Sequence, residues 1–182
     1  MDRPRLATVW LGGCSGCHMS FLDLDESLLE LAQKVDLVFS PIIDAKEYPQ
    51  NVDACLVEGA VCNQEHAEMA HRIRERTRYV ISFGDCAVTG NVSAIRNQLG
   101  LRSAENILQR AYIDNADLNQ QIPEERGIVP PLLERVMPLH EVIHVDLYLP
   151  GCPPPAARIK SFLLQLLEGK APVLTGTDIK FG

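Results

Sequence analysis

The sequence has no long hydrophobic run and no excess of positive charge. None of its apolar stretches approaches the roughly 20 residues that a membrane-spanning helix needs. The chain of 182 residues has 17 Lys and Arg residues against 24 Asp and Glu residues, which gives a formal net charge of -7. A protein with this charge has no general electrostatic attraction to phosphate backbones. We therefore expect no membrane span and no nucleic-acid partner.

The N-terminal segment also lacks the features of a secretory leader. Residues 1–6 include two arginines but no apolar segment and no small-residue cleavage site. The sequence therefore predicts a cytoplasmic protein. Because thiols in the cytosol are kept reduced, clustered cysteines there usually bind metals or carry out redox chemistry. The six cysteines are thus the feature that needs an explanation.

Short β-branched or apolar runs alternate with helical stretches, which is the pattern of a parallel sheet covered by helices. The strand-like runs are residues 6–11, 35–39, 54–57, 79–83 and 145–149. A chain of this length buries roughly 70% of its unfolded surface, which is enough for a core without disulfides. We predict an α/β fold in a single domain over residues 1–182.

The regular alternation fails between residues 92 and 141. This segment includes four prolines and the apolar stretch 128–133. Long irregular insertions in compact domains are usually either functional or disordered. The apolar stretch favours packing against another surface, and a mobile surface loop remains the alternative. We therefore predict an irregular insertion before the last strand.

Four cysteines follow predicted strands at the point where each strand ends. Cys14 and Cys17 follow the first run, Cys86 the fourth and Cys152 the fifth, each near a glycine. The carboxyl ends of parallel strands meet at one edge of a sheet, where ligands bind. Four thiolates suit an iron–sulfur cluster or a tetrahedral zinc ion. One close pair and two single cysteines favour the cluster over structural zinc, which typically uses two pairs, and over a thioredoxin-like dithiol.

The other two cysteines are less specific. Cys55 lies inside the run 54–57, where a free cysteine usually behaves as a small buried apolar residue. Cys62 lies after the end of this run, near the same edge of the sheet. We predict a packing role for both, with a position beside the site as the alternative for Cys62.

Several polar residues also lie near this edge. Glu58 ends a strand beside Gly59, and a role at the site is slightly favoured over a helix cap. His18 follows Cys17 directly, and we expect its side chain to be exposed. Two interpretations are equally consistent with this position: a hydrogen bond near the site, or no functional role. Asp85 and Thr89 are predicted to shape their loop through hydrogen bonds to local backbone.

Four ordered segments resemble the small subunit of nickel-iron hydrogenases. They are residues 12–20 (GGCSGCHMS), 57–60 (VEGA), 84–90 (GDCAVTG) and 150–154 (PGCPP). The resemblance extends from residue 6 to about residue 167. It implies a flavodoxin-like, doubly wound parallel sheet. It also implies one four-iron-four-sulfur cluster with the ligands Cys14, Cys17, Cys86 and Cys152.

Differences from other members of the wider family indicate which subgroup this sequence resembles. Membrane-bound and periplasmic small subunits have a twin-arginine signal and a C-terminal domain with further cluster ligands, and this sequence has neither. The related complex I subunit has adjacent cysteines at its first motif, whereas here Cys14 and Cys17 are spaced. The short, single-cluster form is therefore similar to the small subunit of soluble NAD-reducing hydrogenases. Small subunits of sulfhydrogenases and deazaflavin-reducing hydrogenases are close alternatives.

The resemblance implies an electron-transfer subunit of a hydrogen:NAD+ oxidoreductase. A nickel-iron centre needs two further Cys-x-x-Cys pairs, so hydrogen would be split on a separate large subunit. The cluster would relay electrons between that subunit and a diaphorase module with FMN, NAD and further iron–sulfur clusters. The insertion 92–141 would contact partner subunits. A flavin in the strand-end crevice and a zinc-binding adaptor without a redox role are the alternatives from other classes.

Overall fold

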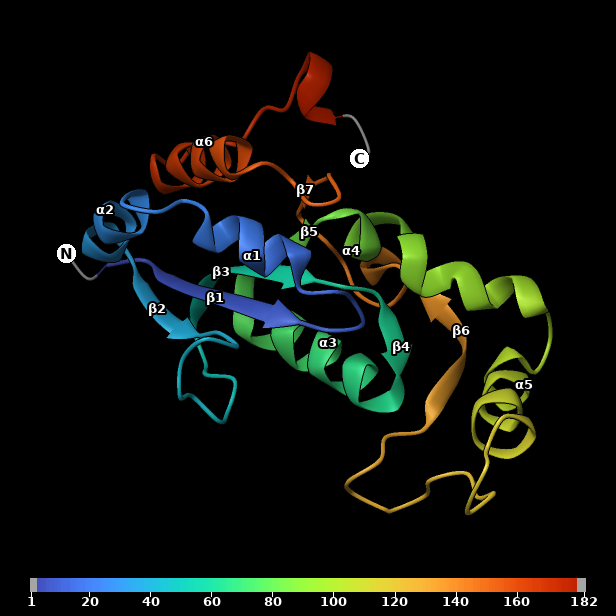
Figure 1. Cartoon of the computed structure of the whole chain (residues 1–182). Coiled ribbons are helices and arrows are strands. Elements are labelled where there is room, and N and C mark those ends of the chain that lie inside the picture. The colour runs from blue at the N-terminus through green and yellow to red at the C-terminus, as the bar shows by residue number, and fades with distance from the viewer. Residues whose placement is uncertain (1–2, 180–182) are drawn as a thin grey trace.

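A five-stranded parallel sheet forms the centre of the computed structural model, which describes residues 3–179 (Figure 1). The strands are β1 (Arg5–Trp10), β2 (Asp36–Phe39), β3 (Val52–Glu58), β5 (Thr77–Phe83) and β7 (Leu147–Leu149). They lie in the order β2-β1-β3-β5-β7, and every neighbouring pair is parallel. This is the 2-1-3-4-5 order of flavodoxin-like folds, so the predicted α/β class and parallel sheet are confirmed.

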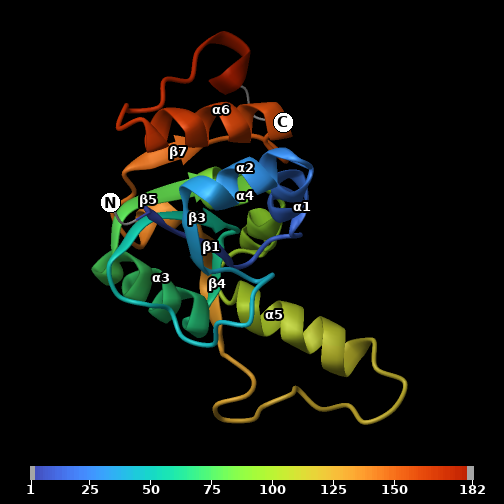
Figure 2. The same ribbon diagram turned by 90° about the vertical axis from the view of Figure 1, so that its left-hand side faces the viewer.

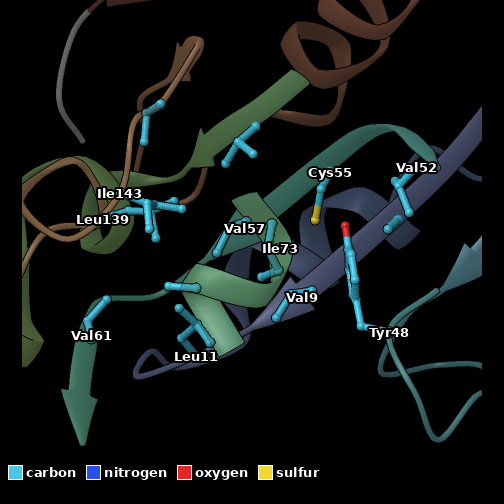
Figure 3. Packing of buried hydrophobic residues seen from close by; sticks show 14 residues of the cluster. Val9, Leu11, Tyr48, Val52, Cys55, Val57, Val61, Ile73, Leu139 and Ile143 are labelled. Carbon is cyan, nitrogen blue, oxygen red and sulfur yellow. The ribbon is translucent and has the colours of Figure 1, made fainter. Parts of the chain in front are cut away.

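Helices cover both faces of this sheet. Helices α1 (Gly16–Leu22), α2 (Ser27–Lys34) and α6 (Ala156–Leu167) lie on one face, and α3 (Gln64–Arg76) lies on the other (Figure 1). Phe21 and Phe162 pack on the first face, whereas Ile73 of α3 packs near Val9 and Val57 on the second (Figure 3). The two buried layers make the doubly wound arrangement stable. Among residues 3–179, no helix is long and apolar enough to cross a membrane.

The last strand is shorter than the predicted run 145–149. β7 begins at Leu147, and the two preceding residues lie outside the strand. Val145 is buried in the core on the α3 side. The Asp146 carboxylate accepts a hydrogen bond of 2.7 Å from the N–H of Val80. The apolar residues of the run 145–149 therefore include a core residue, Val145, that lies outside the strand.

The segment 92–141 is more ordered than the sequence predicts. It includes most of η1 (Asn91–Leu99), and all of α5 (Ser103–Gln109), η2 (Arg110–Asp114), β6 (Leu132–Met137) and η3 (Leu139–Glu141). Strand β6 pairs with β4 (Val61–Asn63) in a second, antiparallel sheet. The predicted insertion before the last strand is therefore present, but much of it is ordered rather than irregular. Residues 115–131, which join η2 to β6, do form an irregular loop.

One arginine explains much of this order. The Arg96 guanidinium donates to the carbonyls of Leu133 (2.5 Å), Cys62 (3.2 Å) and Glu134 (3.2 Å), and to the Ser103 hydroxyl (3.1 Å). These bonds join η1, α5, β4 and β6. Beyond this anchor, α5 and the loop 115–131 project away from the sheet (Figure 2). The segment is thus an anchored arm.

The predicted domain extends beyond the described structure at both ends. Residues 1–2 and 180–182 lie outside the described residues. The assignment of residues 1–182 to a single domain stays a prediction.

Candidate metal centre

The four predicted ligands lie at the carboxyl edge of the sheet. Cys14 is in the loop after β1, Cys17 in α1, Cys86 in α4 (Asp85–Thr89), and Cys152 in the loop after β7. All four are free thiols; Cys17 and Cys86 are buried, whereas Cys14 and Cys152 are exposed. The parallel strands bring these separate segments together, as the strand-end positions predict.

The thiols affect one another electrostatically. Burial raises the pKa of the Cys17 thiol well above its ordinary value, and the charges of Glu58, Cys86, Cys14 and Cys152 raise it further. Burial also raises the pKa of Cys86, with smaller contributions from Cys152 and Cys14 in the same direction. Thiols in this setting keep their protons unless a cation compensates the negative charge. Binding of a metal centre by these thiols would therefore release protons.

Glycines keep space around two of the sulfurs. A Cβ atom on Gly84 would lie 2.1 Å from Cys17 Sγ and 3.4 Å from the Gly151 carbonyl oxygen. A Cβ on Gly16 would lie 3.2 Å from Cys14 Sγ. Any side chain at these two positions would enter the space beside a thiol. The glycines in the two motifs thus form a cradle for a group bound at the sulfurs.

Two N–H donors point at the exposed thiols. The backbone N–H of Gly16 donates to Cys14 Sγ, and the Asn91 side-chain amide donates to Cys152 Sγ, each at 3.4 Å. Such donors stabilise negative charge on sulfur and tune a bound metal centre. Sequence reasoning missed Asn91, although it directly follows the motif 84–90. Nothing in its sequence position indicates a contact with Cys152, which comes 61 residues later.

Hydrogen bonds hold the Cys86 and Cys152 loops together. The Asp85 carboxylate accepts from the N–H of Gly151 at 2.6 Å, and the N–H of Asp85 donates to the Gly151 carbonyl at 2.9 Å. Thr89 donates to the Asp85 carbonyl at 2.9 Å, which confirms its local role. The prediction of a purely local role for Asp85 is wrong, because its carboxylate binds a distant loop.

Glu58 and His18 lie under the Cys14–Cys17 loop. Glu58 is 1% exposed and accepts from the backbone N–H groups of Cys17 (3.3 Å) and His18 (2.9 Å). His18 Nδ1 lies 2.5 Å from the same carboxylate. The expectation of an exposed His18 is wrong: its side chain is buried, because α1 turns it inward toward β3. The slightly favoured placement of Glu58 at the site agrees with this geometry.

Cys55 packs in the core as predicted, whereas Cys62 packs beside the site, where burial raises the pKa of its thiol and Cys86 is close enough to raise it further. Cys55 is fully buried in the core, with its sulfur facing the Tyr48 hydroxyl (Figure 3). Cys62 is half-buried and lies against Gly12, where an added Cβ would be 2.1 Å from its sulfur. Its thiol donates to the Ala60 carbonyl at 3.5 Å.

The side chains of the described residues are not arranged as a site for a single metal ion. Within residues 3–179, no group of three or more His, Cys, Asp or Glu side chains has the arrangement to hold a metal ion. The ligand roles of Cys14, Cys17, Cys86 and Cys152 therefore stay a prediction, supported by their common edge, their mutual electrostatic effects and the glycine cradle.

Comparisons with known proteins agree on one family. Residues 14–166 match the family described as NADH ubiquinone oxidoreductase, 20 Kd subunit. The chain is 38% identical to the delta subunit of the NAD-reducing hydrogenase HoxS of Cupriavidus necator, over 91% of this chain and 79% of that protein. It is 37% identical to a subunit of the F420-non-reducing hydrogenase of Methanothermobacter marburgensis, over 98% of this chain and 58% of that protein. The chain thus spans little more than half the length of the latter relative.

Solved structures show the same fold. A chain in a crystal structure of NAD+-reducing [NiFe]-hydrogenase in the H2-reduced state matches with a TM-score of 0.93 and 39% identity, over 100% of both chains. A [NiFeSe]-hydrogenase of Dm. baculatum matches with a TM-score of 0.56 and 18% identity, over 98% of this chain and 69% of that chain. The second likeness shows the fold alone.

Proposed function

The chain belongs to the family of the NADH ubiquinone oxidoreductase 20 Kd subunit, and on this premise we propose that it is the electron-transfer small subunit of a nickel-iron hydrogenase. One observation supports this proposal above all. Four cysteines from separate strand ends share one edge of a sheet whose fold corresponds over its full length to a chain of an NAD+-reducing [NiFe]-hydrogenase. Hydrogen would be split on a partner large subunit.

The residues at the site fit one four-iron-four-sulfur cluster with the ligands Cys14, Cys17, Cys86 and Cys152. Four thiols supply the donor set that such clusters use, and the glycine cradle leaves room beside the sulfurs. When bound, the cluster supplies one-electron transfer. The protein binds it, shields Cys17 and Cys86 from water, and directs N–H donors at Cys14 and Cys152. These contacts help to set its reduction potential.

We propose NAD+ as the final electron acceptor. The support is the correspondence, over the whole of both chains, with the NAD+-reducing enzyme, together with the likeness to the delta subunit of HoxS. In this proposal the partners are a large subunit and a cytoplasmic diaphorase module with FMN, NAD and further iron–sulfur clusters. An acceptor like that of the F420-non-reducing hydrogenases is the second candidate, favoured by relatives with 36% to 39% identity.

The arm is the proposed contact with partner subunits. Its surface displays apolar side chains that a monomer leaves exposed, including Val92, Ile95, Leu101 and Ile128. Val92 and Ile95 lie on η1, next to Asn91 and its contact with Cys152. Val92 and Ile95 are thus exposed apolar side chains close to the metal centre, where a partner could bury them. A partner on this surface would also cover the exposed side of the metal centre.

Substitution of the four ligands is expected to remove iron from the protein. Serine in place of Cys14, Cys17, Cys86 or Cys152 is expected to lower the iron content of anaerobically purified protein, because a hydroxyl is a poorer ligand for iron than a thiolate. Iron per chain is measured by colorimetric or plasma-emission analysis.

The matched control is Cys55→Ser. Cys55 is buried away from the site, and a serine hydroxyl can keep the hydrogen bond with Tyr48. This variant is expected to retain most of its iron. Equal iron loss in Cys55→Ser, or full iron in the ligand variants, would show that the ligand assignment is wrong.

The acceptor is tested on the complex isolated from its native cells. A flavin-containing partner and H2-dependent reduction of NAD+ are the expected result. A complex that holds the metal centre but reduces only another acceptor would overturn the NAD+ proposal and leave the electron-transfer role intact.

A further inference from the structure

A buried carboxylate lies directly beneath the loop that holds Cys17. Glu58 is the last residue of β3 and is 1% exposed. Its Oε1 accepts from the N–H of Cys17 at 3.3 Å, and its Oε2 accepts from the N–H of His18 at 2.9 Å. His18 Nδ1 is 2.5 Å from Oε2. Three groups at the start of α1 thus converge on one side chain from another strand.

The close approach of Glu58 depends on the neighbouring glycine. A Cβ atom on Gly13 would lie 3.2 Å from Gly59 Cα and 3.6 Å from Glu58 Oε1. A larger residue at position 13 would therefore crowd the loop against β3. With glycine there, the backbone N–H of Cys17 reaches the carboxylate directly.

The carboxylate is held in place through a buried hydrogen-bonded chain. His18 Nε2 lies 3.0 Å from Thr8 Oγ1, and Thr8 Oγ1 lies 2.8 Å from Ser40 Oγ. His18, Thr8 and Ser40 are all buried. Connected polar groups of this kind fix one geometry, because a break would leave a buried polar group without its partner. The position of Glu58 relative to Cys17 is thus fixed through a chain of three further side chains.

We infer that Glu58 is a positioning residue of the metal centre, which fixes the Cys17 backbone and whose negative charge lowers the midpoint reduction potential of the cluster. This inference rests on the proposed function. Coulomb interactions are strong where solvent is excluded, and an added electron is less stable near a fixed negative charge. The carboxylate accepts from the Cys17 N–H at 3.3 Å and is 1% exposed, so solvent does not screen its charge from the ligand loop.

The test is a redox titration of the anaerobically isolated complex, monitored by electron paramagnetic resonance. Glu58→Gln keeps the size of the side chain and removes its charge, so its cluster is expected to titrate at a more positive potential than the wild type. Glu65→Gln is the matched control, because it removes the same charge from an exposed position in the first turn of α3. This control is expected to leave the potential unchanged.

The outcomes separate this inference from the proposed function. An unchanged potential in Glu58→Gln, or an equal shift in Glu65→Gln, overturns the role of Glu58 while the cluster signal of the wild type stands. If Glu58→Gln does not hold iron, Glu58→Asp tests the role of the charge instead, because it keeps the carboxylate on a shorter side chain. Iron retained by Glu58→Asp at a potential close to that of the wild type supports the role, and iron loss in both variants overturns it. A wild-type complex without any iron–sulfur signal would instead refute the proposed function.

Discussion

Replacement of Gly84 by alanine is expected to remove most of the iron that the protein binds. The added Cβ would lie 2.1 Å from Cys17 Sγ, much closer than the two atoms can approach without a bond. Cys17 cannot easily move away, because its backbone is bound to Glu58. Gly84 also has a φ of +81° and a ψ of 162°, a conformation essentially restricted to glycine that costs alanine roughly 1–3 kcal/mol. The measurement is iron per chain after anaerobic purification.

Gly100→Ala is the matched control for this prediction. Gly100 has a φ of +78°, so alanine suffers a similar conformational penalty there. Nothing lies within 4 Å of the Cβ that would be added. This variant is expected to lose some stability and to retain its iron. Full iron in Gly84→Ala, or comparable loss in Gly100→Ala, would contradict the proposed crowding of Cys17.

Asp85→Ala is expected to lower both the stability and the iron content. The Asp85 carboxylate accepts from the buried N–H of Gly151 at 2.6 Å and so joins the loops of Cys86 and Cys152. Loss of that acceptor leaves a buried N–H unpaired, which costs about 1–3 kcal/mol of the free energy of unfolding. The two loops would then separate more readily. Chemical denaturation gives the stability, and metal analysis gives the iron content.

Asp53→Ala is the control that separates a loss of stability from a loss of iron. The Asp53 carboxylate accepts from the N–H of Arg5 at 2.7 Å, near the start of β1 and β3 and therefore at the opposite end of the strands. Its loss removes a comparable hydrogen bond without touching the ligand loops. The variant is expected to be less stable but to retain its iron. Unchanged iron in Asp85→Ala would mean that the loop contact has no part in metal binding.

The sheet and the edge where the cysteines lie could be predicted from the sequence for simple reasons. The five strands are short apolar runs, and their period separates them from the helical stretches between them. Parallel pairing then places residues such as Cys14 and Cys152 at the same edge. Cys55 could be assigned to the core because it lies inside an apolar run, and the structure buries it fully.

Long-range polar contacts could not be predicted in this way. Arg96 orders the arm through three backbone carbonyls and a hydroxyl, and hydrophobic periodicity does not report such bonds. The same is true of Asp85, whose partner Gly151 is 66 residues away. His18 is next to Cys17 in the sequence, yet its burial depends on the direction of a short helix and on the carboxylate of Glu58.

The central claim is that the four cysteines hold one iron–sulfur cluster. Its most direct test is electron paramagnetic resonance of the anaerobically purified protein before and after reduction, with iron, sulfide and zinc measured on the same sample. The expected result is a brown protein with about four iron and four sulfide ions per chain and a signal that appears on reduction. A colourless protein that contains zinc and gives no signal on reduction would contradict the claim.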